Sequence, residues 1–282
     1  MPRIKIIKHN IMFTPFSMRD EDRINKNDLT KISLKFETVN EVNNRSSLRQ
    51  KVLSKSSRDD CIQLSDKLYA CNYEPCCSAA CPRCFRCYRR WFYAEVCHLY
   101  EQYDEAYSLT IIYYDECLTS KELYKYDPKT LKDRLRQQLK RSGFKQPVIG
   151  CLEIDYHPEI NRWLPHFHLL VLGDPIPVIA LRRNFKKNIQ VKGRTSKANR
   201  PVHVRIIKNK EKQLSYLCKS YWSRVEAYTN KQGKRQTRKV ALKSKQLQLS
   251  LLVLDRMGYS GLLFLYGVRR RGSKLLKTAV SE

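Results

Sequence analysis

The sequence predicts an α+β fold in which a central antiparallel sheet carries helices on one face and follows a cysteine-rich zinc-binding segment. Two observations lead to this prediction. Between residues 107 and 228, stretches that alternate like strands are interspersed with stretches of helical periodicity, in the order strand, helix, strand, strand, helix, strand, helix. Immediately before them, seven cysteines lie between Cys71 and Cys97.

The first elements of the sheet region are recognised by periodicity and by capping residues. Residues 107–114 alternate and are rich in β-branched side chains, so they predict a strand. Asp127-Pro128 is a favourable helix start, leucines then recur every four residues, and Ser142-Gly143 ends the helix. Residues 148–155 are apolar and predict the second strand.

The later elements enter the basic part of the chain. An apolar run that begins near Pro165 and ends at Gly173 predicts the third strand. We expect the remaining elements to be a helix over residues 178–188, a strand over 202–207 and a helix over 208–228.

Composition divides the chain into four regions. Residues 1–60 are polar and charged and predict a poorly ordered leader with one short strand near residues 32–36. Residues 61–102 hold the cysteine-rich zinc-binding segment, and residues 103–230 hold the predicted sheet. Residues 231–282 predict a basic C-terminal extension with an apolar, helix-like run followed by a strand-like run.

The charge of the chain indicates a polyanionic partner. Its 282 residues include 55 Lys and Arg against 27 Asp and Glu, a net charge of +28. Residues 182–245 alone hold 21 basic residues and two acidic ones, Glu211 and Glu226. Nucleic acid is favoured over a membrane surface because the charge is not confined to one amphipathic helix.

No stretch approaches the roughly 20 apolar residues of a membrane span, and the basic N-terminus lacks the apolar core of a signal peptide. We therefore expect a cytoplasmic protein with reduced thiols, in which the 11 cysteines are metal ligands or free.

The cysteine segment predicts a structural zinc site. Cysteines separated by two other residues can reach one Zn²⁺, because a tight turn brings both thiolates to about 2.3 Å from the ion. The alternative is a cluster of cysteines without a metal. The predicted ligands are Cys77, Cys81, Cys84 and Cys87, and Cys71, Cys76 and His98 are further candidates to complete the set.

The third strand carries a candidate catalytic metal site. His166 and His168 are two residues apart, so on a strand both imidazoles point to one face and can hold one ion. Two satisfied structural histidines are the alternative, although unpaired imidazoles on a buried strand are costly. The preceding strand offers Glu153 and Asp155 as hard oxygen ligands, unless they are acids that face solvent.

The sequence Pro165-His166-Phe167-His168 and the apolar strand after it resemble the metal-binding signature of the HUH endonuclease superfamily. This superfamily contains the single-strand nickases of rolling-circle initiators, relaxases and related transposases. The order Glu153-Ile-Asp-Tyr, a loop and then the histidines is similar to the second motif of plasmid initiators, which implies Glu153 as the third ligand. Residues 77–90, with Cys-Pro-x-Cys before two arginines, also resemble the cysteine segment of some initiators.

Tyr216-x-x-Lys219 resembles the third motif of single-tyrosine initiators and implies Tyr216 as nucleophile. A free phenol has a pKa of about 10, so attack at neutral pH needs the metal or Lys219. Tyr221 is a rival or second nucleophile. On a continuous helix it would lie about 140° around the axis from Tyr216, so both could not face the metal equally.

The resemblance implies an HUH nuclease-like nicking domain and a rolling-circle replication initiator. Such a protein would nick single-stranded origin DNA, keep the 5′ end on Tyr216, free a 3′-OH primer and later rejoin the strand. Its cofactors would be Mg²⁺ or Mn²⁺ at Glu153, His166 and His168, and Zn²⁺ at the cysteines. Origin DNA, a host helicase and a polymerase are the implied partners, without a membrane. The alternatives are an HUH-type transposase and a non-catalytic, zinc-containing DNA-binding regulator.

Overall fold

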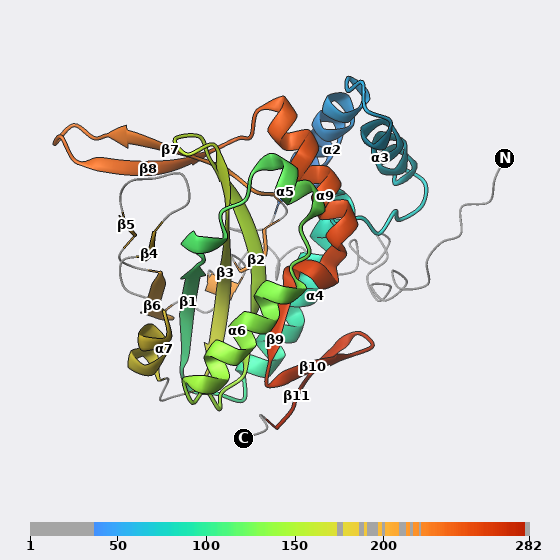
Figure 1. The fold of residues 1–282 in the computed structure, drawn as a ribbon. Coiled ribbons are helices and arrows are strands. Elements are labelled where there is room, and N and C mark those ends of the chain that lie inside the picture. Colours follow the sequence, from blue (N-terminus) through green and yellow to red (C-terminus); the bar gives the residue numbers. More distant parts are fainter. Residues whose placement is uncertain are drawn as a thin grey trace.

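The computed structural model describes residues 37–173, 177–185, 189–190, 197–198, 201–208, 213–214, 217–219 and 221–279. These residues form an α+β fold around a curled, mostly antiparallel sheet, as predicted (Figure 1). Within the described chain the sheet has seven strands in the order β6-β1-β3-β2-β7-β8, with β9 also paired to β2. The strands are β1 (Ala106–Ile112), β2 (Val148–His157), β3 (Arg162–Leu172), β6 (Val202–Ile206), β7 (Arg224–Thr229), β8 (Arg235–Val240) and β9 (Leu263–Tyr266).

The centre of the sheet is β2, which lies between β3 and β9 along its first half. Nine of its ten residues are buried, which explains its nearly continuous apolar sequence. Gly150 pairs with Leu169 on one side and Phe264 on the other. A Cβ at Gly150 would collide with the carbonyl oxygen of His168, so this position requires glycine.

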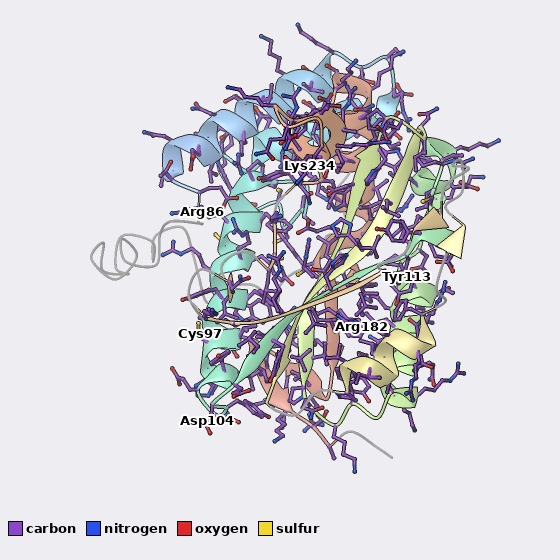
Figure 2. The ribbon with its side chains drawn as sticks, turned by 90° about the vertical axis from the view of Figure 1, so that its left-hand side faces the viewer. Arg86, Cys97, Asp104, Tyr113, Arg182 and Lys234 are labelled. Carbon is purple, nitrogen blue, oxygen red and sulfur yellow. The ribbon has the colours of Figure 1, made fainter. Side chains whose placement is uncertain are left out.

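Helices cover both faces of the sheet, and the prediction of one covered face is wrong. Figure 2 shows the sheet between α4 (Pro82–Tyr100) on one side and α6 (Lys129–Arg141) on the other. α6 buries the predicted leucines, and α4 buries aromatic side chains. The reason is that β2 and β3 are buried on both faces and need cover on both. The residues involved are Leu131, Leu135 and Leu139 of α6, and Phe85, Tyr88, Trp91 and Phe92 of α4.

Residues 37–60 are ordered, in contrast to the predicted leader. They contain α2 (Val39–Ser54) and the start of α3 (Asp59–Ala70). A capping box starts α2: Thr38 accepts from the amide of Glu41, and Glu41 accepts from the amide of Thr38. Arg49 is buried and donates to the carbonyl of Ala80 at 2.6 Å, which ties α2 to the cysteine segment. The strand predicted at residues 32–36 lies outside the described residues.

The helix predicted over residues 208–228 is wrong in its second half. Residues 217–219 and 221–223 are not helical, and β7 pairs with β8 as a hairpin. Its turn is closed by bonds between Asn230 and Lys234 and between Gly233 and Asn230, and Gly233 has a φ of +73°. The turn residues and the β-rich sequence on both sides were signals for a hairpin.

The residues predicted as a C-terminal extension belong largely to the main fold. α9 (Ser244–Leu262) and β9 agree with the predicted helix-like and strand-like runs. β9 pairs with β2, and Phe264 packs against Phe167 with ring centroids 5.5 Å apart. α9 also contacts the helices α2 and α3, so a segment predicted as an extension packs against the first described helices.

The described residues also form several shorter elements. They are the 3-10 helix η4 (Tyr114–Glu116), α5 (Ser120–Lys125), α7 (Val178–Asn184), the pair β4 (Ile189–Gln190) and β5 (Lys197–Ala198), and the pair β10 (Val268–Arg271) and β11 (Lys274–Lys277). None of the helices in the described part of the chain has the length and apolar character needed to traverse a bilayer.

Candidate functional site

The pairing of β2 with β3 brings the three predicted metal ligands together. Glu153 lies directly opposite His166, and Cys151 lies opposite His168. Oε2 of Glu153 is 3.6 Å from Nε2 of His166 and 3.6 Å from Nε2 of His168. One ligand atom from each residue falls within 4.8 Å of the others, so the group could hold a metal ion.

Hydrogen bonds orient both imidazoles toward Glu153. Nδ1 of His166 lies 3.2 Å from the carbonyl oxygen of Leu164. Because a carbonyl can only accept, we assign the proton of His166 to Nδ1, which leaves the Nε2 lone pair for a ligand. Nδ1 of His168 lies 3.1 Å from Oγ1 of Thr110 on β1. Such outer partners are typical of metal-binding histidines.

The electrostatics of the site favour an ionised Glu153. Burial alone would raise the pKa of this carboxyl, but His168, His166 and Lys219 together hold the pKa well below its usual range. Burial lowers the pKa of His168, although Glu153 opposes this shift. One carboxylate and two imidazoles form a donor set that suits a divalent cation.

The second carboxylate oxygen of Glu153 is also available to bind a cation. Its Oε1 is buried and receives no hydrogen bond from the described residues. A buried carboxylate oxygen without a donor is costly, and a bound cation would remove that cost. The residues present therefore fit a divalent ion.

Asp155, the other candidate oxygen ligand, is held by different partners. Its Oδ1 accepts from the amide of Ser223 at 2.7 Å, and its Oδ2 lies 2.6 Å from Nζ of Lys239. Of the two candidate histidine ligands, the described contacts of Asp155 include His166, whose Nε2 is 3.8 Å from Oδ2. The geometry therefore favours Glu153, which is close to both histidines.

Among the described residues, two lysines lie beside the predicted metal ligands, and only one of these lysines was predicted. Nζ of Lys219 is 3.8 Å from Oε2 of Glu153, and its side chain is 10% exposed. Nζ of Lys239, on β8, is 3.7 Å from the same oxygen. Lys239 was missed because it is one of 55 basic residues and nothing in the sequence distinguishes it.

The predicted nucleophile, Tyr216, lies outside the described residues. Its rival Tyr221 is 40% exposed, and the guanidinium of Arg45 on α2 lies over its ring, 5.0 Å from the centroid. Because residues 217–219 and 221–223 are not helical, the rotation argument that separated the two tyrosines does not apply.

Four cysteine thiols form a second group that could hold a metal ion such as Zn²⁺. Sγ of Cys71 is 3.5 Å from Sγ of both Cys81 and Cys84, and Sγ of Cys76 is 3.8 Å from that of Cys84. Cys71 follows α3, Cys76 lies in the loop, and Cys81 and Cys84 are at the start of α4. Four thiolates in one cluster match a closed structural zinc site.

The cluster contains two of the four predicted ligands, Cys81 and Cys84, and two of the further candidates, Cys71 and Cys76. The predicted ligands Cys77 and Cys87 lie outside it. Cys77 has a left-handed backbone with φ of 53°, and its Sγ turns to the carbonyl of Pro75 at 3.7 Å.

Cys87 lies one turn further along α4 than Cys84, about 4.5 Å up the helix axis. His98 is near the far end of α4 and faces Glu101, 3.7 Å away. Neither belongs to the cluster.

Comparisons with known proteins give no relative for this chain: no family model, no curated protein and no solved structure matches it. The function of this chain must therefore be inferred from the geometry of the site and from the motif resemblance.

Proposed function

We propose that this protein is a metal-dependent single-strand DNA endonuclease and strand transferase of the HUH type that initiates rolling-circle replication. The observation that carries the proposal is the cluster of Glu153, His166 and His168 on neighbouring antiparallel strands. In this arrangement the acid precedes the histidine strand and faces both imidazoles, as the motif order implies.

In this proposal, separate residues would bind the metal and attack the DNA. Mg²⁺ or Mn²⁺ held by Glu153, His166 and His168 would supply Lewis-acid stabilisation of charge on the scissile phosphate. The phenol oxygen of Tyr216 would attack phosphorus and form a phosphotyrosine bond. The bond between phosphorus and the 3′ oxygen would break, and that oxygen would leave as a 3′-OH after taking up one proton, which balances the proton that the phenol gives up. Attack of a 3′-OH on the phosphotyrosine would later rejoin the strand and release the phenol.

Lys219 supports this scheme by position. Its ammonium group lies at the candidate metal centre and its side chain is nearly buried, so its charge acts at short range in a poorly solvated place. It can offset the negative charge of a phenolate or of the phosphate. The net charge of +28 supports binding of the DNA itself.

A second candidate function is a non-catalytic, zinc-containing DNA-binding regulator. One observation favours it: Lys219 and Lys239 both lie within 4 Å of Glu153, so they can balance the carboxylate without a metal. An HUH-type transposase would use the same site as the initiator, and the geometry does not separate those two enzymes.

The test is a search for covalent protein–DNA adducts. The full-length protein is mixed with a pool of labelled 40-nucleotide single strands of random sequence and Mn²⁺, then denatured and run on a gel. We expect a labelled band above the mass of the free protein, absent in EDTA, and enrichment of a preferred sequence in the recovered DNA. If DNA binds in the presence of Mn²⁺ but neither cleavage nor an adduct is detected, the result supports the non-catalytic regulator.

A further inference from the structure

We propose that the β7–β8 ribbon, residues 224–240, binds duplex DNA in its major groove and holds it beside the candidate metal centre. This inference rests on the proposed function, because it specifies that the nuclease substrate is a single strand next to a DNA duplex. Binding of duplex DNA by the ribbon can be measured independently of nuclease activity.

The ribbon leaves the sheet almost immediately. β7 and β8 pair over six residues each, but β7 pairs with β2 only at Arg224 opposite Tyr156. Among the described strands, β8 has no neighbour other than β7. Figure 1 shows the two strands projecting away from the body of the molecule. An isolated two-stranded ribbon is marginally stable in water, so a projecting one is expected to serve a partner.

The charge of the ribbon specifies the kind of partner. Every residue from Lys231 to Lys239 is exposed, and Lys234 lies near the tip (Figure 2). In the described structure, Lys231 and Lys234 have no acidic partner, so their charges are available to phosphates. The ribbon contains six basic residues, Arg224, Lys231, Lys234, Arg235, Arg238 and Lys239, and one acidic residue, Glu226.

The size of the ribbon fits the major groove of B-form DNA. That groove is about 12 Å wide and admits a two-stranded β-ribbon. Six residues per strand extend over about 20 Å. This length corresponds to about six base pairs at 3.4 Å per step. Near the tip, Gln236 and Thr237 are exposed on opposite faces of the ribbon, and each belongs to a residue type that reads base edges, so either face offers one such residue.

The base of the ribbon is fixed at the candidate metal centre. Asp155 accepts from the amide of Ser223, just before β7, and binds Lys239 near the end of β8. Lys239 is also 3.7 Å from Glu153. A duplex lying along the ribbon would therefore end at the metal site, which is where a strand leaving the duplex would meet the nuclease.

The experiment compares two pairs of lysines in the full-length protein. Lys231→Gln/Lys234→Gln alters the ribbon, and Lys121→Gln/Lys129→Gln removes the same charge from exposed positions on α5 and α6. The probes are a 24-base-pair DNA duplex and an RNA duplex of the same sequence, with affinity measured from low to high salt.

We expect the ribbon variant to bind DNA duplex at least fivefold more weakly at low salt. Its salt slope should fall by about 1.8, or 0.9 for each lost phosphate contact. The control should keep the wild-type affinity and slope. Wild type should prefer the DNA duplex, because the major groove of A-form RNA is too narrow for side chains to read. A shortened ribbon, with residues 228–236 replaced by Asn-Gly, should lose this preference.

Two results would overturn the inference. One is an equal affinity of the ribbon variant and the control variant for duplex DNA. That result would indicate that the basic residues only prevent the exposed strand edge from pairing with other chains. The other is an equal loss on the DNA and RNA duplexes, which would indicate a general polyanion surface. Adduct formation on single strands reports the proposed nuclease separately, and the ribbon variant should retain it.

Discussion

Nζ of Lys239 lies 2.6 Å from Oδ2 of Asp155 and thereby joins the end of β8 to the strand that carries Glu153. Asp155 is 2% exposed, and its other oxygen accepts from the amide of Ser223. One buried carboxylate therefore holds both strands of the β7–β8 ribbon at the point where they leave the sheet.

The first prediction concerns this ion pair. Asp155→Asn should lower the free energy of unfolding by about 1–2 kcal/mol, because the amide can still accept from Ser223 but loses the charge that pairs with Lys239. The loss is smaller than for a fully buried pair, since the Lys239 side chain is 40% exposed. Urea denaturation measures it. Glu159→Gln, which removes the surface partner of Arg235, is the control and should cost less than about 0.5 kcal/mol. Equal effects of the two changes would contradict the role given to Asp155.

The second prediction separates chemistry from binding. His166→Ala and His168→Ala should each abolish cleavage of single-stranded DNA while keeping affinity within about twofold, because phosphate contacts dominate affinity and the metal acts at one bond. Filter binding and gel assays on the same oligonucleotide measure both. His203→Ala changes an exposed histidine on β6 and should leave cleavage intact. Wild-type cleavage by the double variant would rule out the metal site.

The third prediction concerns the cysteine cluster. Purified protein should contain about one zinc per chain, and Cys71→Ser or Cys84→Ser should lose it together with cooperative folding, because metal binding is coupled to folding. Elemental analysis and circular dichroism measure the two effects. Cys77→Ser and Cys87→Ser lie in the same segment outside the cluster and should keep the zinc. Loss of zinc in all four variants alike would argue against the assigned ligand set.

The fourth prediction places the C-terminal residues in the core. Phe264→Ala should lower the free energy of unfolding by about 3–5 kcal/mol, because it removes a fully buried ring that packs against Phe167. Phe167 is the residue between His166 and His168 in the sequence. Thermal or urea denaturation provides the measurement. Ile206→Ala changes a residue that is 63% exposed and should cost no more than about 0.5 kcal/mol. A small effect of Phe264→Ala would indicate that β9 is an appendage after all.

The part of the site that sequence could predict depends on local spacing. Alternation along a strand determines that His166 and His168 share a face, and the adjacency of consecutive strands places Glu153 near them. Cys81 and Cys84 were predictable for the same reason, since one helical turn holds them together. In each case few residues separate the partners, so local geometry alone constrains them.

The rest of the site depends on packing that spacing does not encode. Cys71 joins the cluster because α3 ends beside the start of α4, and Lys239 reaches Asp155 because the hairpin folds back. The ordered residues 37–60 were hidden by their polar composition, although Thr38 and Glu41 form a capping box that could have been recognised. The contacts of Cys71 and Lys239 therefore required the tertiary structure, whereas the helix in residues 37–60 was missed because composition was weighed above the capping residues.

The last prediction names the residue that becomes joined to DNA. Tyr216 lies outside the described residues, but Lys219 is three residues later and lies 3.8 Å from Glu153. Tyr221 is also close in sequence, but its ring lies under Arg45, which is bound to Glu37 at 3.0 Å.

Tyr216→Phe should therefore keep the fold, the zinc and the affinity for DNA while abolishing both the nick and the adduct. Tyr221→Phe is the matched change two residues beyond Lys219 and should retain the nick at a rate within about threefold of wild type, because the substitution keeps the ring beneath Arg45 and cation–π contacts of exposed pairs are weak. Peptide mapping of the adduct formed on a single-stranded oligonucleotide identifies the modified residue. A phosphotyrosine at Tyr221, or cleavage without any adduct, would show that Tyr216 is not the nucleophile.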